Sequence, residues 1–492
     1  MSGHPGTAGR GITMAARTRL PVAFVLAVLV PSAACRAQPP ELAVDGPVTA
    51  PIEYGKWFQY ERDLFGYNPA FMPGPVSFDL ANRPYILAFD DDAGTNAAVQ
   101  TLDDDGNWIR LDHKVSVLQR YPEWDGAYLT GVSCEARIVF DGDGDAYMVM
   151  DARSSNLEKV LLLHSRDRCR SWDVYELPCG YARLEFQDTH NDLSRPPVVL
   201  GRAIRTNLYL FAPTKNADGT LTIPEPVNVT GGCIGGGLPA HSAGNIAVTR
   251  GDMTHIVWAR RYAVEGHVGT PQYARSYNRA TGELTEAVLL GAAGRNIDSH
   301  NWPVAALDSR GYIHVILAAH GSRQGQHFKW TLSVEPNTAA AFTPPEPLVS
   351  GFTYPALLCD ADDRLHLVAR MHGMPYRLMY LHKDPGQPWS EPTPLVVPYQ
   401  EDAPVYKIWY HKLDVDRRGR MFLSYWHYSL VGSDDQAAAY AEKWPEDSFT
   451  RGDDGTYTYE RMRPHEPCMM ISDDGGETWR LALTHDFLAG ID

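Results

Sequence analysis

The sequence is poor in cysteine, carries no excess of positive charge and contains no long apolar segment. Its 492 residues include seven cysteines and no C-x-x-C pair, which argues against a zinc ribbon. The formal net charge of −16 argues against nucleic acid as a partner, because phosphate binding needs a basic surface. The longest apolar run, Leu20–Val30, is too short to cross a bilayer. We therefore expect no integral membrane span in the mature protein.

That short apolar run instead resembles the centre of an export signal. Arg17 and Arg19 precede it, and the small residues Ser32–Ala34 lead to Cys35. We predict a signal peptide over 1–35, followed by a spacer over 36–52. Cleavage before Cys35 would give a lipoprotein and cleavage near Ala34 plain secretion. The expected location is therefore secreted, periplasmic or on the outer surface of a bacterium.

One structural unit recurs along the rest of the chain. Each copy is an apolar strand, a polar turn rich in Asp or Gly, and a second apolar strand. Forty-two glycines and 36 prolines suit a chain of many short strands and turns. The copies are Val76–Ala88, Ala136–Val149, Pro197–Phe211, Ala243–Trp258, Val304–Leu317, Ala356–Val368 and Lys412–Tyr425.

Two further strand-like segments lie between successive copies. Seven repeats of four strands predict an all-β fold, a seven-bladed β-propeller with four-stranded antiparallel blades. The propeller would form a single, monomeric domain over 53–492, with Ile52–Tyr60 closing the ring against the last blade. Residues 429–464 would be a long insertion in that blade, acting as a wall or lid.

The two stretches at Ser165–Trp172 and Ser472–Trp479 resemble the Asp-box, S-x-D-x-G-x-T-W. The second matches every position, and the first has Cys169 in place of glycine. Asp and Ser of such a turn bind backbone amides, and the Trp packs between strands. Both stretches are therefore predicted to be structural. Cys169 and Cys179 are the best-spaced pair for a disulfide, which export would permit.

Blade topology sorts the remaining polar residues onto two faces. The turn face carries the turns between first and second strands and between third and fourth strands. The funnel face carries the entries to first strands and the exits of second strands. The residues predicted on the funnel face are Asn68, Asp151, Arg153, His190, Asn191, Asp192, His241, Arg260, Arg261, Tyr262, His300, His320, Tyr354, His372, His411 and His427.

Histidine and arginine around a hollow favour an anionic ligand. Trp302 lies beside these positions and could stack on a sugar ring. An acidic polysaccharide is therefore the expected partner. Asp151, Asp192 and Asp298 are the candidate acids, but they form no evident pair of the kind that a glycoside hydrolase needs. A polysaccharide lyase needs a cation, a base and an acid, and Arg, His and Tyr supply these better.

Other interpretations stay open at this point. A histidine cluster could hold a divalent metal, zinc or calcium, with His190, His241 and His300 as candidate ligands; no cofactor is otherwise indicated. A glycoside hydrolase of rhamnosidase type is the alternative enzyme, and a glycan-binding lipoprotein is the non-catalytic alternative. Sialidase activity is disfavoured because the F-R-I-P phrase is missing.

The Asp-boxes, the H-N-x-x-x-R-P-P run at His190–Pro197 and the repeated D-x-x-G turns resemble the BNR-repeat propeller proteins. Within that group they are most similar to the propeller-fold ulvan lyases and their rhamnose–glucuronate relatives. The resemblance implies a His/Tyr/Arg site that cleaves uronate next to rhamnose, in a polysaccharide of the ulvan type that can carry sulfate. It implies His190 as the catalytic histidine, Tyr262 as acid or base, and Arg260 or Arg261 as the group that neutralises the carboxylate. Asn191, His241, His300, His320, His372, His411, His427 and Trp302 would then bind substrate.

Overall fold

The computed structural model describes most of the chain after residue 75. The described residues are 48–50, 75–89, 97–131, 137–154, 156–202, 207–230, 244–298, 300–320, 327–398, 408–428, 433–443, 449–453, 455, 457–459 and 464–492. All of them belong to one unit formed by residues 42–492. The predicted closing strand at Ile52–Tyr60 and the predicted leader lie outside the described residues.

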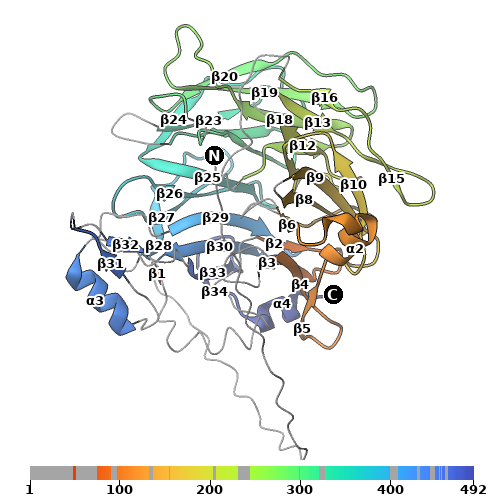
Figure 1. Cartoon of the computed structure of the whole chain (residues 1–492). Coiled ribbons are helices and arrows are strands. Elements are labelled where there is room, and N and C mark those ends of the chain that lie inside the picture. The colour runs from red at the N-terminus through yellow and green to blue at the C-terminus, as the bar shows by residue number, and fades with distance from the viewer. Residues whose placement is uncertain are drawn as a thin grey trace, which may run out of the picture. The chain divides into compact units, whose positions relative to one another are not determined.

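Seven antiparallel sheets follow one another along the chain as the blades of a β-propeller, which confirms the predicted fold (Figure 1). Blade 1 contains β2 (Val76–Phe78), β3 (Pro84–Phe89), β4 (Ala97–Leu102) and β5 (Trp108–Leu111). In blade 2, β6 (Tyr128–Gly131) and β7 (Val139–Phe140) both pair with β8 (Ala146–Ser154), followed by β9 (Leu157–Ser165) and β10 (Asp173–Leu177). Blade 3 contains β11 (Tyr181–Leu184), β12 (Val199–Arg202), β13 (Leu208–Phe211) and β16 (Val227–Asn228).

The remaining four blades repeat this order. Blade 4 contains β17 (Ala247–Arg250), β18 (Met253–Ala259), β19 (Thr270–Asn278) and β20 (Val288–Ala293). Blade 5 contains β21 (Val304–Leu307), β22 (Ile313–Leu317), β23 (His327–Leu332) and β24 (Glu346–Ser350). Blade 6 contains β25 (Phe352–Cys359), β26 (Leu365–Met371), β27 (Leu378–Lys383) and β28 (Thr393–Pro398), with β1 (Val48–Ala50) parallel to β28. Blade 7 contains β29 (Ile408–Val415), β30 (Met421–Tyr428), β33 (Pro464–Ser472) and β34 (Arg480–Leu481).

Few helices accompany the sheets in the described part of the chain. They are α2 (Lys114–Arg120), a 3₁₀ turn (Pro122–Trp124), α3 (Asp434–Lys443) and α4 (Thr484–Gly490). Two small hairpins complete the structure, β14 (Thr214–Lys215) with β15 (Leu221–Thr222), and β31 (Phe449–Arg451) with β32 (Tyr457–Tyr459). Among the described residues, no helix is long and apolar enough to cross a membrane.

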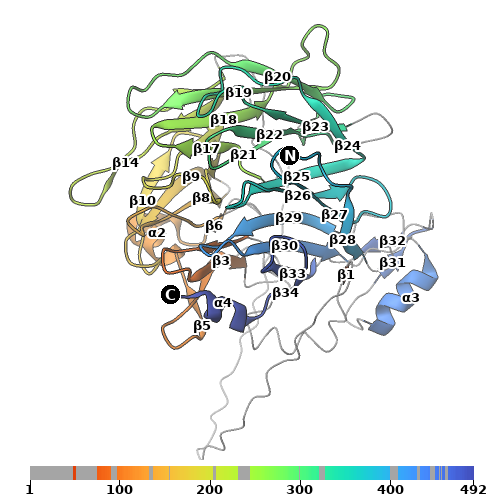
Figure 2. The ribbon, with the colours of Figure 1, turned by 180° about the vertical axis from the view of Figure 1, so that it is seen from behind.

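The hydrophobic core lies between neighbouring blades, because each sheet buries both faces. Strands such as β22 and β25 are buried along their whole length, as expected for sheets covered on both sides. The first and last blades meet in the same way (Figure 2). Phe78 of β2, Phe422 of β30 and Phe487 of α4 form one aromatic cluster there, with ring centroids 5.0–6.5 Å apart.

The Asp-box turns have the predicted structural role. Ser472 Oγ accepts a hydrogen bond from Gly476 N, and Asp474 accepts hydrogen bonds from the backbone and side chain of Thr478. Cys169 N donates to Ser165 Oγ in the same manner. Cys169 and Cys179 are not bonded to each other. They flank β10 on opposite ends; this five-residue strand alone is about 16 Å long, whereas a disulfide needs Cα atoms within about 7 Å.

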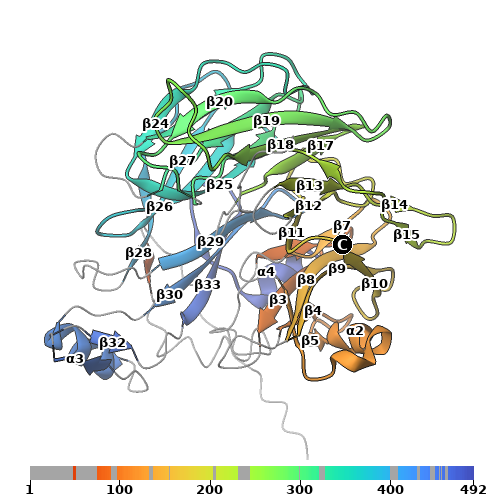
Figure 3. The ribbon, with the colours of Figure 1, turned by 45° about the horizontal axis from the view of Figure 1, so that its top comes forward.

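Blade 3 departs from the predicted register. Gly201, predicted to be a turn, lies inside β12, where it pairs with Ala182 of β11 and Tyr209 of β13. The hairpin predicted over Pro197–Phe211 therefore comprises the second and third strands of the blade. β11 is the first strand, and it lies beside β8 of blade 2 (Figure 3). Residues 185–198 then form the connection from the first to the second strand, and we call them the blade-3 loop.

Candidate functional site

Three histidines and a tyrosine meet at the funnel face of blades 5 and 6. His300 precedes β21, His320 follows β22, Tyr354 lies near the start of β25 and His372 follows β26. The His320 ring centroid lies 4.4 Å from that of His300, 4.7 Å from that of His372 and 5.2 Å from that of Tyr354. The prediction that His300 and His320 end on the same side of their hairpin is confirmed. With Asp298, Thr353 and Arg370, these residues form what we call the funnel cluster.

Asp298 holds His300 in a defined orientation. Its Oδ1 accepts hydrogen bonds from the His300 backbone N at 2.9 Å and from His300 Nδ1 at 2.6 Å. Burial would raise the pKa of Asp298, but the hydrogen bonds from His300 outweigh it and lower that pKa to about 2. Asp298 is therefore ionised at neutral pH, and His300 Nδ1 carries the proton that it donates. In a neutral His300, Nε2 is then the ring nitrogen that carries the electron pair.

His320 is neutral at physiological pH. Burial, followed by the charge of His300, lowers the pKa of His320 to about 3. Its Nδ1 lies 2.6 Å from the hydroxyl of Thr353, a fully buried residue of β25. Burial also lowers the pKa of His372, and the positive charge of Arg370 adds to the effect.

An irregularity in β25 brings Tyr354 to the cluster. The register between β25 and β26 shifts between Thr353 and Ala356, and Tyr354 has a φ of 56°. A positive φ is unfavourable for a tyrosine, and such backbone strain concentrates at functional sites. The ring packs on the guanidinium of Arg370, 4.9 Å from the ring centroid. Arg370 is buried and donates a hydrogen bond to Ile408 O at 3.1 Å, so it supplies a fixed positive charge beneath the cluster.

Two residues predicted to bind substrate belong to the core instead. Trp302 is 1% exposed and packs among the apolar residues of blades 4 and 5, so it offers no surface for a sugar ring. His411 is fully buried on β29, with Nε2 3.3 Å from Val368 O. Burial, with the charge of Lys412, lowers its pKa to about 3. His241 lies outside the described residues, and so does the side chain of His427.

The predicted arginine and tyrosine lie on the loop that follows β18 of blade 4. Arg260 is half-buried and donates to Tyr273 Oη at 3.3 Å, whereas Arg261 and Tyr262 are exposed. On blade 2, Asp151 is buried and pairs with Arg153 at 2.5 Å. Burial raises the pKa of Asp151 to about 6, although Arg153 opposes the rise.

The predicted place of His190 and Asn191 on the funnel face is wrong. Both belong to the blade-3 loop, which lies on the turn face because β11, not β12, is the first strand. His190 Nε2 lies 2.7 Å from Asp360 O in the turn between β25 and β26. Asn191 donates to Phe186 O, and Asp192 accepts a hydrogen bond from Gly251 N in the turn of blade 4. The loop also borders a cavity of about 610 Å³ together with turns of blades 1, 2, 6 and 7.

Sequence reasoning did not select Thr353 and Arg370. A signal for Arg370 was present, because it lies two residues before His372 at the exit of the same strand. Thr353 carried no such signal, since an isolated threonine in a strand is most often structural. Asp298 had been named only as one of three separate acids, and its hydrogen bond to His300 is what gives it a role.

Among the residues that the structure describes, two groups of side chains have the spacing to hold a metal ion. One consists of Asp298, His300 and His320, and the other of His190, Cys359 and Asp363; in each, the ligand atoms lie within 4.8 Å of one another. His190 and His300 lie on opposite faces. They cannot share an ion, so the trio of His190, His241 and His300 predicted from the sequence does not form one site.

Comparison with known proteins gives one family match and several similar solved structures. Residues 246–486 match the family model described as BNR repeat-containing family member. No curated protein matches the chain. Solved structures similar to it include a polysaccharide lyase of family PL25, an ulvan lyase bound to -[GlcA(1-4)Rha3S]- (17% identity, TM-score 0.39, 51% of this chain). They also include an α-L-arabinanase of Penicillium chrysogenum complexed with arabinobiose (10% identity, TM-score 0.37, 59% of this chain and 88% of the arabinanase).

The chain spans 57% of the length of that ulvan lyase. The predicted resemblance to BNR-repeat propellers is confirmed by the family match together with the seven observed blades. Residues 246–486 of this chain are thus similar to the BNR repeat-containing family, and the described chain forms a seven-bladed β-propeller.

Proposed function

We propose that this protein is a carbohydrate-active enzyme that cleaves a uronate-containing polysaccharide of the ulvan type by β-elimination at the funnel cluster. One observation carries the proposal: an ionised carboxylate, Asp298, orients His300 beside a second histidine that is neutral at physiological pH. A carboxylate and an imidazole so joined form a general base at neutral pH.

In the proposed reaction, His300 Nε2 removes the proton from the carbon next to the uronate carboxylate. The electron pair of that C–H bond forms a carbon–carbon double bond, and the bond to the 4-linked oxygen breaks. That oxygen leaves with its electron pair and takes a proton from the Tyr354 hydroxyl. Tyr354 is the hydroxyl of the funnel cluster: its ring contacts His320 and lies 6.1 Å from that of His300, centroid to centroid. Tyr354 is 4% exposed, so the leaving oxygen would have to enter the cluster to reach the hydroxyl. Asp298 acts as a positioning residue for His300.

Removal of that proton requires the substrate carboxylate to be neutralised. Arg370 supplies a positive charge close to His320 and His372, as its effect on both histidines indicates. Because Arg370 is buried, His372 is the neighbouring side chain that could donate directly to the carboxylate. Arg260 and Arg261 remain candidates for this contact on the neighbouring loop of blade 4.

Hydrolysis is the alternative, and Asp151 is the observation in its favour. A hydrolase needs two carboxyl groups facing the scissile bond, one of them protonated. Asp298 cannot donate a proton because its pKa is about 2. Asp151 has a raised pKa of about 6 and could do so, but its partner is Arg153 rather than a second carboxylate.

Incubation with ulvan and other uronate polymers distinguishes a lyase from a hydrolase and from a glycan-binding protein. We follow the ultraviolet absorbance of an unsaturated uronate and the appearance of reducing ends together. A rise in both supports β-elimination. Reducing ends without absorbance would replace the lyase by a hydrolase, and binding without either would leave a glycan-binding protein.

Two variants test the site itself. His300→Gln and Tyr354→Phe should each lower kcat by roughly 10²-fold or more, the usual contribution of a general base or acid, with an unchanged melting temperature. Tyr312→Phe is the matched control, because Tyr312 lies at the turn-face end of the blade 5 hairpin. Full activity of His300→Gln would remove this residue from the mechanism.

A further inference from the structure

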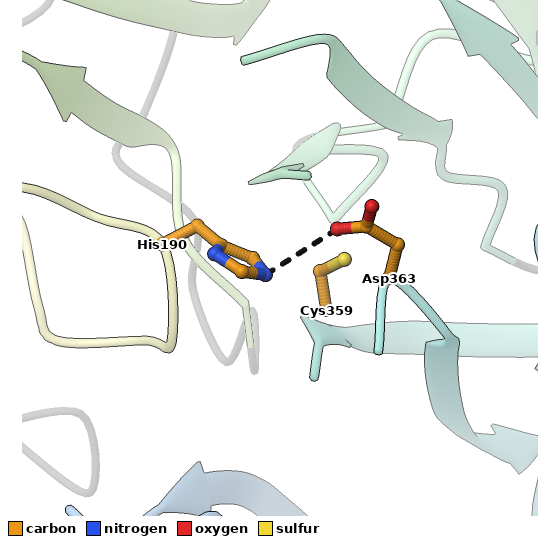
Figure 4. A group of neighbouring side chains, drawn as sticks. All are labelled: His190, Cys359 and Asp363. Carbon is orange, nitrogen blue, oxygen red and sulfur yellow. Dashed lines mark ion pairs between the residues drawn. The ribbon is translucent and has the colours of Figure 1, made fainter. Parts of the chain in front are cut away.

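A second constellation of reactive side chains lies on the turn face, away from the funnel cluster. It brings together His190 of the blade-3 loop, Cys359 at the end of β25 and Asp363 in the turn that follows (Figure 4). The imidazole faces the carboxylate, with the sulfur beside them. Residues 190 and 359 are far apart in the sequence, so the fold alone creates this group.

The spacing of these atoms is compatible with a shared ion. His190 Nε2 lies 3.5 Å from Asp363 Oδ1, and other His–Asp pairs in the described part of the chain range from 2.6 Å for His300–Asp298 to 3.8 Å for His314–Asp308. Tetrahedral zinc, with bonds of about 2.0–2.3 Å, holds its ligand atoms about 3.3–3.8 Å apart. The His190–Asp363 distance is therefore too long for a hydrogen bond and suits two ligands of one ion.

The surroundings carry negative charge that the residues present only partly compensate. Asp188 of the same loop is 5% exposed, and its Oδ2 has no hydrogen-bond partner among the residues that the structure describes. The carboxylates whose charge acts on the Cys359 thiol are those of Asp188, Asp363, Asp360 and Asp308. Asp188 Oδ1 accepts hydrogen bonds from the backbone N of His190 and Asn191. A buried carboxylate oxygen without a partner is costly, and a cation beside Oδ2 would remove that cost.

We propose that His190, Cys359 and Asp363 bind one Zn²⁺ ion, with the fourth position taken by Asp188 or water. Imidazole and thiolate select zinc over calcium or magnesium, which prefer oxygen ligands alone. On binding, the thiol releases its proton to solvent. His190 keeps its ring proton on Nδ1, and its present contact with Asp360 O is replaced by the bond to the metal. The ion would fasten the blade-3 loop to blade 6, independently of any reaction at the funnel cluster.

The test measures metal content and stability, not activity. Protein prepared with zinc and freed of loose metal should hold one zinc per chain by elemental analysis. A chelator should lower its melting temperature, and added Zn²⁺ should restore it. Cys359→Ser and Asp363→Asn should each weaken zinc binding at least tenfold, whereas the control Cys179→Ser, with a thiol at the far end of β10, should not.

Cobalt supplies a direct signature of the thiolate. Co²⁺ in place of zinc should give a thiolate-to-cobalt charge-transfer band that is lost in Cys359→Ser and kept in Cys179→Ser. Circular dichroism establishes that each variant is folded. If Cys359→Ser does not fold, Asp363→Asn, at a partly exposed turn position, takes its place in the test. Absence of bound metal with no thermal response to Zn²⁺ would overturn the proposal. Binding that survives Cys359→Ser but is lost in His320→Asn would overturn it too, because the ion would then lie at the funnel cluster.

Discussion

At the scale of single residues, the chemistry of the proposed site depends on one hydrogen bond, from His300 Nδ1 to Asp298. The imidazole has two nitrogens that can carry its proton, and the hydrogen bond to the ionised carboxylate selects Nδ1. The same arrangement explains why Asp298 is a poor proton donor. Asp298 must stay ionised to hold the histidine, so its carboxylate has no proton to give to a substrate.

We expect Asp298→Asn to lower kcat by roughly 10²-fold or more and to leave KM nearly unchanged, because Asp298 positions a base and does not touch substrate. Steady-state kinetics on a uronate polymer measure the split between kcat and KM. Asp218→Asn, in the exposed hairpin of β14 and β15, is the matched control and should retain wild-type kinetics. A kcat within twofold of wild type in Asp298→Asn would contradict the positioning role.

The sequence could identify single site residues only in part, for reasons visible at Trp302 and His411. Both stand near the start of a first strand, where residue type and spacing predict a place at the funnel. Whether such a side chain faces the channel or the space between blades depends on the local twist and register, which the sequence does not display. The positive φ of Tyr354 and the register shift in β25 are tertiary features of that sort.

At the scale of structural elements, blades could be predicted where Asp and Gly residues mark the turn between the first and second strands. Asp308–Gly311 and Asp416–Gly419 close tight turns, in which the Asp side chain accepts backbone amides and Gly adopts a positive φ. Six of the seven predicted hairpins therefore have the observed strand order. In blade 3 the first strand is short and a long loop follows it, so Gly201 was mistaken for the turn. That single shift placed His190 on the wrong face.

Helix α2 supplies a pH-dependent element. His113 precedes this helix, is fully buried, and neither ring nitrogen has a hydrogen-bond partner among the residues that the structure describes. Burial lowers its pKa to about 4, with Asp112 opposing the effect. An unfolded chain has a histidine pKa of about 6.5. Between these values the unfolded state binds a proton that the folded state does not, so stability is lost as pH falls through this window.

We therefore expect His113→Leu to become more stable relative to wild type on acidification. The difference in the free energy of unfolding between variant and wild type should shift by about 2 kcal/mol in favour of the variant between pH 7.5 and pH 5. Denaturant unfolding at both pH values measures it. Val115→Ala, an exposed substitution on the same helix, should show the same difference from wild type at both values. If the difference in unfolding free energy between His113→Leu and wild type does not change with pH, this histidine does not titrate as described.

At the scale of the whole molecule, the junction of the first and last blades has to be built by side chains. Asn82 of blade 1 donates to Asp416 of blade 7 and to Gly490 O, and Arg417 N donates to Asn82 Oδ1. Helix α4 covers the junction with Phe487, which stacks on Phe78 and Phe422. The end of the chain thus stabilises the contact between its two outermost blades.

We expect Phe487→Ala to lower the free energy of unfolding by about 3–5 kcal/mol, the usual cost of removing a buried aromatic ring. Equilibrium denaturation measures the loss. The adjacent Leu488→Ala should change stability by no more than about 0.5 kcal/mol, because Leu488 is 41% exposed. Equal effects of the two substitutions would argue against a special role for this junction.

The blade-3 loop has a consequence for how the molecule comes apart. A chain of repeats in which each unit contacts only its neighbours can lose its units one by one from an open end. The blade-3 loop adds a contact between blades that are not neighbours. Asp192 of this loop is hydrogen-bonded to blade 4, and His190 contacts blade 6. When the contact between any two neighbouring blades opens, the contact of His190 with blade 6 stays in place. The blades therefore gain cooperativity that nearest-neighbour packing does not provide. The contact between residues 190 and 360 also closes a very long segment of chain, which is slow to form. This contact should therefore form later in folding than the hairpin turns within each blade.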